Sequence, residues 1–211
     1  MARRTKEEAL ETRHKLLDAA EHLFQLQGVS RTSLQDIARR AGATRGAVYW
    51  HFKDKADLFN AMMERVTLPL EESIQDLAPD QEPDSLARIC QVVHGALLRI
   101  AQDPQTRRVF EVATQKVEYI DELQAVRLRH LKIRSDFLGH AECGLQASAA
   151  ARGMPLRLSP GMAAQGLHAL IDGLIQNWLL DSEAFDLVSA GDQLLDVYLT
   201  GLGFKPSEKM G

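Results

Sequence analysis

Cysteine is scarce in this sequence, with two residues among 211. Cys90 and Cys143 are too few and too isolated for a disulfide framework or a zinc site, so we expect both to be reduced. Long apolar runs are also missing: Asp172 interrupts the best candidate, residues 167–180, so no segment reaches the ~20 apolar residues of a membrane helix. The charged N-terminus has no apolar stretch behind it and gives no secretory signal. These absences predict a cytoplasmic protein that does not bind membranes.

Clusters that carry metal or catalytic chemistry are missing as well. His94, His130 and His140 do not have the spacing of metal ligands. Glu142 and Cys143 lie near His140 in the chain but form no catalytic arrangement with it. We therefore expect no enzymatic activity, no metal and no cofactor.

Charge is unevenly divided along the chain. The composition, 45% hydrophobic and 26% charged, is typical of a soluble globular protein with one domain or two small ones. The net charge is −4, but the first 55 residues carry eleven Lys or Arg against seven Asp or Glu, and the remainder is acidic. A basic head on an acidic body indicates that only the head meets a polyanion.

The spacing of apolar residues predicts an all-α protein, because no segment sustains the period-two alternation of a strand. A first helix runs from Lys6 to Gln27, and Thr32–Gln35 has the form of a capping box for a short second helix that ends at Gly42. Thr44 caps a third helix and Asp54 a fourth, so residues 33–52 make a helix-turn-helix. We expect a DNA-binding domain over 1–55 and a helical domain over 56–211, with further helices near 84–102, 105–115, 119–151, 161–180 and 186–202.

In a helix-turn-helix the second helix enters the major groove and its first residues contact base edges. Arg45 stands at that position, where a guanidinium can donate two hydrogen bonds to guanine. Tyr49, His51 and Lys55 suit phosphate oxygens, and we expect a basic arm before the first helix to contact a groove or phosphates. The alternative is a solvated basic turn beside a buried aromatic pair. The predicted DNA-binding residues are Arg3, Arg4, Lys6, Thr32, Ser33, Thr44, Arg45, Gly46, Ala47, Tyr49, Trp50, His51 and Lys55.

The stretch TSLQDIARRAGATRGAVYWHFKDK, residues 32–55, closely resembles the DNA-binding head of TetR-family transcriptional repressors. Residues 2–9 and 11–13 narrow the resemblance to repressors of multidrug efflux-pump operons, of the AcrR and TtgR type. Weaker similarity continues through 116–119 and 172–180. Val117 stands where such repressors commonly have Cys, and Gln176 and Asn177 lie near positions where such repressors have basic residues. The identity of the ligand therefore does not follow from the resemblance.

The resemblance implies a two-domain repressor in which three helices bind DNA, a fourth connects, and the body binds a small molecule and dimerises. The last two long helices are apolar over more than one stripe, which favours burial against a partner chain over the alternative of a central helix in a monomer. The predicted interface is Leu167, Leu170, Leu174, Trp178, Leu195, Tyr198 and Leu199. The resemblance implies an effector pocket lined by Val93, Ala96, Phe110, Thr114, Phe137, His168, Asp172 and Gln176. The alternative is that these side chains only pack in the core or, for Asp172, form a salt bridge or a backbone cap.

These features predict a homodimeric repressor that binds a near-palindromic DNA duplex and is released by a small hydrophobic or amphipathic effector. We expect the connecting helix, residues 55–77, to swing on effector binding as the only covalent path from body to head. Two alternatives stay open: a TetR-type regulator of catabolic or lipid genes, and an all-helical small-molecule binding protein or enzyme whose basic head is incidental.

Overall fold

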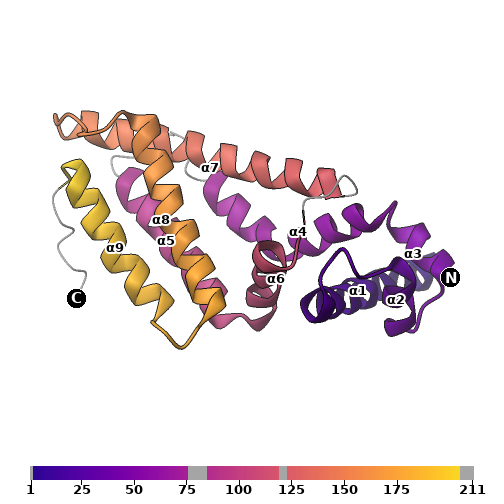
Figure 1. Ribbon diagram of the computed structural model, residues 1–211. Helices are drawn as coiled ribbons and strands as arrows, with labels where there is room; N and C mark the ends of the chain where they lie inside the picture. Colours follow the sequence, from indigo (N-terminus) through magenta and orange to yellow (C-terminus); the bar gives the residue numbers. More distant parts are fainter. Residues whose placement is uncertain (1, 76–84, 119–122, 205–211) are drawn as a thin grey trace. The chain divides into compact units, whose positions relative to one another are not determined.

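The computed structural model describes residues 2–75, 85–118 and 123–204, and in these ranges every regular element is an α-helix (Figure 1). The predicted all-α class is confirmed. The part of the predicted seventh helix at 119–122 lies outside the described residues, and none of the described helices is long and apolar enough to cross a membrane. The helices are α1 (Ala2–Gln27), α2 (Leu34–Arg40), α3 (Arg45–His51), α4 (Lys55–Gln75), α5 (Ser85–Gln102), α6 (Pro104–Gln115), α7 (Gln124–Ala151), α8 (Pro160–Leu180) and α9 (Leu187–Leu202).

The chain packs as two compact units. The head unit comprises Met1–Leu68 and Gln105–Leu131, and the body unit comprises Pro69–Pro104 and Lys132–Gly211. The backbone therefore passes between the units three times: inside α4, at the start of α6 and inside α7. The connecting helix is one of three covalent links between them, and not the only one as expected, because α6 packs with the head. A functional boundary at residue 55 stays a prediction, since the compact units divide the chain differently.

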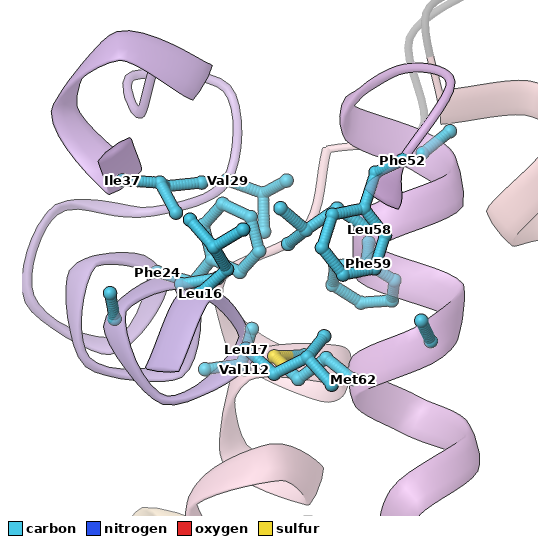
Figure 2. Close-up of a cluster of buried hydrophobic side chains, with 14 of the residues drawn as sticks. Leu16, Leu17, Phe24, Val29, Ile37, Phe52, Leu58, Phe59, Met62 and Val112 are labelled. Atoms are coloured by element: carbon cyan, nitrogen blue, oxygen red, sulfur yellow. The ribbon is translucent and has the colours of Figure 1, made fainter. Parts of the chain in front are cut away.

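The head unit is organised around one apolar core (Figure 2). Helix α1 contributes Leu16, Leu17 and Phe24, which recur at helical spacing and are fully buried. The rings of Phe24 and Phe59 of α4 pack at a centroid distance of 6.0 Å. Val112 of α6 lies in the same cluster. Each such side chain contributes about 1.5–3 kcal/mol through burial, so α6 is part of what stabilises the head.

Helix α2 begins with a capping box one residue later than the sequence indicates. The Ser33 hydroxyl accepts from the Asp36 N–H at 3.1 Å, and the Asp36 carboxylate accepts from the Ser33 N–H at 3.2 Å. The Ser33 hydroxyl also donates to the Asp36 carboxylate at 2.5 Å, and this bond, together with the one from the Ser33 N–H, lowers the pKa of the Asp36 carboxyl. The predicted cap at Thr32 is wrong, because the Thr32 hydroxyl turns inward and donates to the Gly28 carbonyl at 2.7 Å.

The turn between α2 and α3 is made by Gly42, whose φ of +66° lies in the left-handed region that favours glycine. The Ala43 N–H donates to the Ala38 carbonyl at 2.9 Å and closes the end of α2. The predicted cap of α3 is confirmed, since the Thr44 hydroxyl accepts from the Ala47 N–H at 3.2 Å. Asp54 caps α4 as predicted, accepting from the Asp57 N–H at 2.8 Å.

Helix α1 begins at Ala2, before the predicted start at Lys6. Arg3, Arg4 and Lys6 therefore lie within the helix rather than in an arm that precedes it. The expectation that these residues precede the first helix is wrong, because they continue its backbone, while their contact with DNA stays a prediction.

In the body unit, α9 packs against both α5 and α8. Glycine at position 191 of α9 makes room for the side chain of Leu97 on α5, because a Cβ there would require Leu97 to shift. Helix α8 begins with Ser159 as cap and Pro160 in its first turn, and α9 begins with Asp186, whose carboxylate accepts from the Ser189 N–H at 2.6 Å. The ends of both helices are therefore set by local sequence.

Four residues of the predicted dimer interface lie in the interior of the body unit: Leu167, Trp178, Leu195 and Leu199. Their burial within one chain leaves them little surface for a partner, and the interface stays a prediction. Their packing follows the alternative, in which an apolar helix is central within one chain. Leu170, Leu174 and Tyr198 are half-buried.

Candidate nucleic-acid interface

Helix α3 presents one buried and one exposed face. Val48 is fully buried and anchors the helix to the head core. Arg45 and Gly46 are exposed at its start, while Tyr49 and Trp50 are 50% and 72% exposed. The alternative of a buried aromatic pair is therefore excluded. Large aromatic side chains in water next to an arginine are suited to contact with another surface.

Arg45 and Tyr49 interact along the exposed face of α3, one turn apart. An Arg45 Nη donates to the Tyr49 hydroxyl at 3.3 Å, and the guanidinium carbon lies 5.5 Å from the centre of the Tyr49 ring. The hydrogen bond with Tyr49 raises the pKa of Arg45, so the guanidinium stays charged. This arrangement holds the predicted base-reading group at the start of the helix.

His51 closes α3 among aromatic and cationic neighbours. Its ring meets the Trp50 ring edge-on at a centroid distance of 4.5 Å, and the Arg13 guanidinium of α1 lies over the adjacent Phe52 ring at 5.3 Å. Burial, and secondarily the charge of Arg13, lower the pKa of His51. The imidazole is therefore held toward its neutral form, which carries one N–H donor.

Several predicted DNA-binding residues meet at one hollow of about 520 Å³ on the surface of the head unit. Ser33 at the start of α2, Arg45 and Tyr49 of α3, and Lys55 of α4 all line it. Thr32 of the predicted set lines it as well. The prediction does not include the remaining residues of the wall, whose signal in the sequence is their adjacency to the predicted caps: Ser30, Arg31, Leu34, Gln35, Lys53 and Asp54.

Lys55 differs from the expectation of an exposed phosphate contact. It is 7% exposed, and its ammonium donates to the backbone carbonyls of Ser30 and Thr32, each at 3.3 Å. These two bonds tie the start of α4 to the loop that precedes α2. Lys55 thus positions the Ser33 end of α2 while also bordering the hollow.

The predicted effector residues fall in both compact units. Phe110 and Thr114 belong to α6 in the head unit, and the Thr114 hydroxyl donates back to the Phe110 carbonyl at 2.8 Å. The other six lie in the body unit: Val93, Ala96, Phe137, His168, Asp172 and Gln176. Among them the Phe137 and His168 rings meet at 5.6 Å, and the half-buried Asp172 accepts from Gln176 at 2.6 Å. Their assembly into one pocket stays a prediction.

Helices α8 and α9 also carry apolar side chains that are exposed: Met162, Leu180, Leu194 and Val197. Val197 is 66% exposed and lies one turn after Leu194 on α9. Sequence analysis did not place these residues in the interface. Their signal is the phase of the helix: Leu195 and Leu199 occupy the buried stripe, which leaves Leu194 and Val197 on another side.

Comparison with known proteins covers nearly the whole chain. Residues 16–62 match the family described as bacterial regulatory proteins, tetR family, and residues 84–204 match the MAATS-type transcriptional repressor C-terminal region. The transcriptional regulator TtgR of Pseudomonas putida is 35% identical over 208 residues, which are 98% of this chain and 99% of TtgR.

Two solved structures are similar in both sequence and fold. NalD of Pseudomonas aeruginosa is 37% identical with a TM-score of 0.83, over 92% of this chain and 98% of NalD. SmeT of Stenotrophomonas maltophilia, in its complex with triclosan, is 31% identical with a TM-score of 0.80, over 93% of this chain and 95% of SmeT. These relatives are transcription regulators and not enzymes. The helix-turn-helix, the full-length matches and the shared fold together show that this chain belongs to the TetR family of bacterial transcriptional regulators, with a C-terminal region of the MAATS type.

Proposed function

We propose that this protein is a cytoplasmic homodimer that represses a multidrug efflux-pump operon and is released from DNA by bulky hydrophobic or amphipathic compounds. The observation that carries this proposal is full-length similarity to two efflux regulators. NalD is described as the secondary repressor of the MexAB-OprM multidrug efflux pump, and SmeT as the repressor of the SmeDEF pump. The similarity spans head and body alike, so it supports both operator binding and effector response.

DNA recognition rests on the exposed face of α3 and the adjoining hollow. Arg45 at the start of α3 reads a base edge, and Gly46 beside it leaves room for the helix to approach the groove. Tyr49 and the Ser33 end of α2 face phosphates from the hollow. Because phosphate contacts release counterions, operator affinity falls steeply with salt.

Dimerisation uses the exposed apolar side chains of α8 and α9. Leu180, Leu194 and Val197 are 73%, 41% and 66% exposed in one chain, and burying them against a second copy removes apolar surface from water. A twofold dimer presents two α3 helices, so its operator is a near-palindrome.

The effector is an apolar or amphipathic compound held in the helical body. The SmeT complex contains triclosan, a relative's ligand of this chemical kind. Asp172 is half-buried between apolar residues of α8 and favours a cationic or hydroxylated ligand. Only a compound that prefers the DNA-free arrangement of the heads causes release, since equal affinity for both arrangements shifts nothing.

Three measurements test the proposal. Selection of duplexes from a random pool by the purified protein identifies the operator, and anisotropy titration at several salt concentrations measures its affinity. A strain lacking the gene is then compared with its parent for the transcripts that rise. Raised efflux-pump transcripts and a near-palindromic duplex support the proposal. Catabolic or lipid transcripts would instead select the alternative regulator, and binding without salt dependence would contradict DNA recognition.

A further inference from the structure

Helix α6 is built into the core of the head although it follows directly on a helix of the body. Thr106, Val109 and Val112 of α6 are fully buried, and the two valines belong to the core shared with α1 and α4. One residue, Asp103, separates α6 from α5, and α5 packs on α9 in the body unit. A single residue of chain therefore joins a helix of the body unit to a helix of the head core.

Polar contacts tie α6 to α1, and to the residue two positions after α1, at three levels that are four residues apart in the chain. At the first level Glu21 accepts from two α6 side chains. At the second, Gln25 donates to Glu111 at 2.9 Å. At the third, the Val29 N–H donates to the carbonyl of Lys116, just after α6, at 3.1 Å. These contacts follow α6 along its length.

Glu21 is the buried member of this series, with a side chain only 3% exposed. One of its oxygens accepts from Arg108 Nε of α6 at 2.7 Å. The other accepts from Arg65 of α4 at 3.0 Å and from Gln105 of α6 at 3.1 Å. A buried carboxylate needs such donors, so moving α6 away from Glu21 is strongly unfavourable unless another cation compensates.

Arg65 holds the same carboxylate from α4. Its second nitrogen pairs with the largely exposed Asp18 of α1 at 2.7 Å, so Arg65 is bound to α1 through two acidic side chains. If Arg108 left Glu21, the carboxylate would still be paired with Arg65. Helix α1 in turn packs against both α2 and α3.

We propose that the Glu21 carboxylate is the regulatory link between α6 and the DNA-binding helices. When α6 moves, the loss of Arg108 from Glu21 shifts α1 and with it α2 and α3, so the signal reaches α3 through α1 as well as along α4. The inference rests on the proposed function and adds a route for its regulation. Linkage makes the route reciprocal: DNA bound to the head must also stabilise α6.

Hydrogen exchange of α6, measured in the full-length protein with and without the selected duplex, tests the link. In the wild type we expect the duplex to slow exchange of residues 105–115 by at least about fivefold, the lower end of typical allosteric coupling. In Glu21→Gln and Arg108→Gln we expect that slowing to fall below about twofold, while the duplex still protects α3. Glu111→Gln is the matched control, because it removes a carboxylate from the same pair of helices without touching an arginine, and it should behave as wild type.

Arg108→Gln keeps the proposal testable if Glu21→Gln fails to fold, since Glu21 then retains Arg65. Equal slowing of α6 exchange in wild type and Arg108→Gln overturns the link, and so does a wild type that binds the duplex with no change in α6. A wild type that binds no selected duplex overturns the proposed function and this inference together.

Discussion

The hydroxyl of Tyr198 on α9 donates a 2.7 Å hydrogen bond to the backbone carbonyl of Ala163 on α8. The phenol reaches that carbonyl across Gly166, where a Cβ would overlap the ring. Burial raises the pKa of Tyr198, so the hydroxyl remains a donor. The absence of a side chain at position 166 is therefore what lets α8 and α9 approach at this point.

Gly166→Ala should lower the free energy of unfolding by about 1–3 kcal/mol, because the methyl group forces Tyr198 or the helix to shift. Gly139→Ala on α7 is the control, since a Cβ there meets nothing within 4 Å and alanine favours a helix. Chemical denaturation of both variants measures the difference. Equal destabilisation at the two positions would contradict the close contact with Tyr198.

Arg45→Ala should reduce discrimination at one or two base pairs of the operator by about tenfold to a hundredfold, because the guanidinium reads a base edge. Anisotropy titrations against operators with single base-pair changes measure this loss. Lys55→Ala provides the contrast: it should weaken all sequences alike and also lower the melting temperature, because the Lys55 ammonium supports the Ser30 and Thr32 carbonyls. If Lys55→Ala changed the base preference and Arg45→Ala did not, Lys55 and not Arg45 would be the residue that reads the base.

His51 should make folding sensitive to acid. Because its folded-state pKa lies below the ordinary 6.5, its contribution to stability is present above pH 6.5 and is lost as the pH falls through the folded-state pKa. His51→Gln should therefore lose less stability than wild type between about pH 7.5 and pH 5. Urea denaturation at both pH values measures the difference. His22→Gln, at an exposed position of α1, should keep the wild-type dependence.

Leu194→Glu combined with Val197→Glu should convert the proposed dimer to monomers, because it places two charges on the exposed apolar side of α9. Operator affinity should fall with the dimer, and the melting temperature should no longer depend on protein concentration. Sedimentation velocity reports the oligomeric state. Leu26→Glu serves as control, since Leu26 is 73% exposed on α1 and belongs to the head unit. A dimer that survives the double change would rule out this interface.

Asp172→Ala should weaken release by cationic compounds by at least about tenfold, the effect of losing one charge-assisted hydrogen bond, and spare release by neutral ones. Phe110→Trp should change the potency of both kinds. Neither should alter operator affinity without effector. Displacement from the labelled operator by triclosan and by a quaternary ammonium amphiphile measures potency. Unchanged potency for every compound in both variants would disprove these positions as pocket residues, and leave DNA binding unaffected.

Much of the head is predictable from local sequence because its elements are set by caps and turns. Thr44, Asp54 and Gly42 act as their positions predict, since each acts on backbone groups within a few residues. The shift of the α2 cap from Thr32 to Ser33 shows the limit. Both residues carry a hydroxyl, and the choice between them depends on Gly28, a residue of the preceding turn, accepting from Thr32.

The sequence does not show which side chains are buried or which residues far apart in the chain pair with one another. The apolar stripes of α8 and α9 are visible, but which stripe faces α5 depends on a contact such as Gly191 with Leu97, more than ninety residues apart in the chain. For the same reason Glu21 is ordinary in the sequence, and its burial beneath Arg108 follows only from the packing of α6. Charge alone made Lys55 a phosphate contact, whereas packing turns its ammonium toward two carbonyls.

Val109 and Val112 of α6 are part of the head core, and this limits how hybrid repressors can be assembled from this protein. A cassette cut at residue 55 or 62 and fused to the effector domain of another regulator leaves behind the two valines that fill its interior and the arginine that neutralises Glu21. The transplantable module is discontinuous: it consists of α1 to the middle of α4 together with α6 and the start of α7. Exchange of specificity between such regulators is therefore simpler by replacing the exposed side chains of α3 than by joining whole domains.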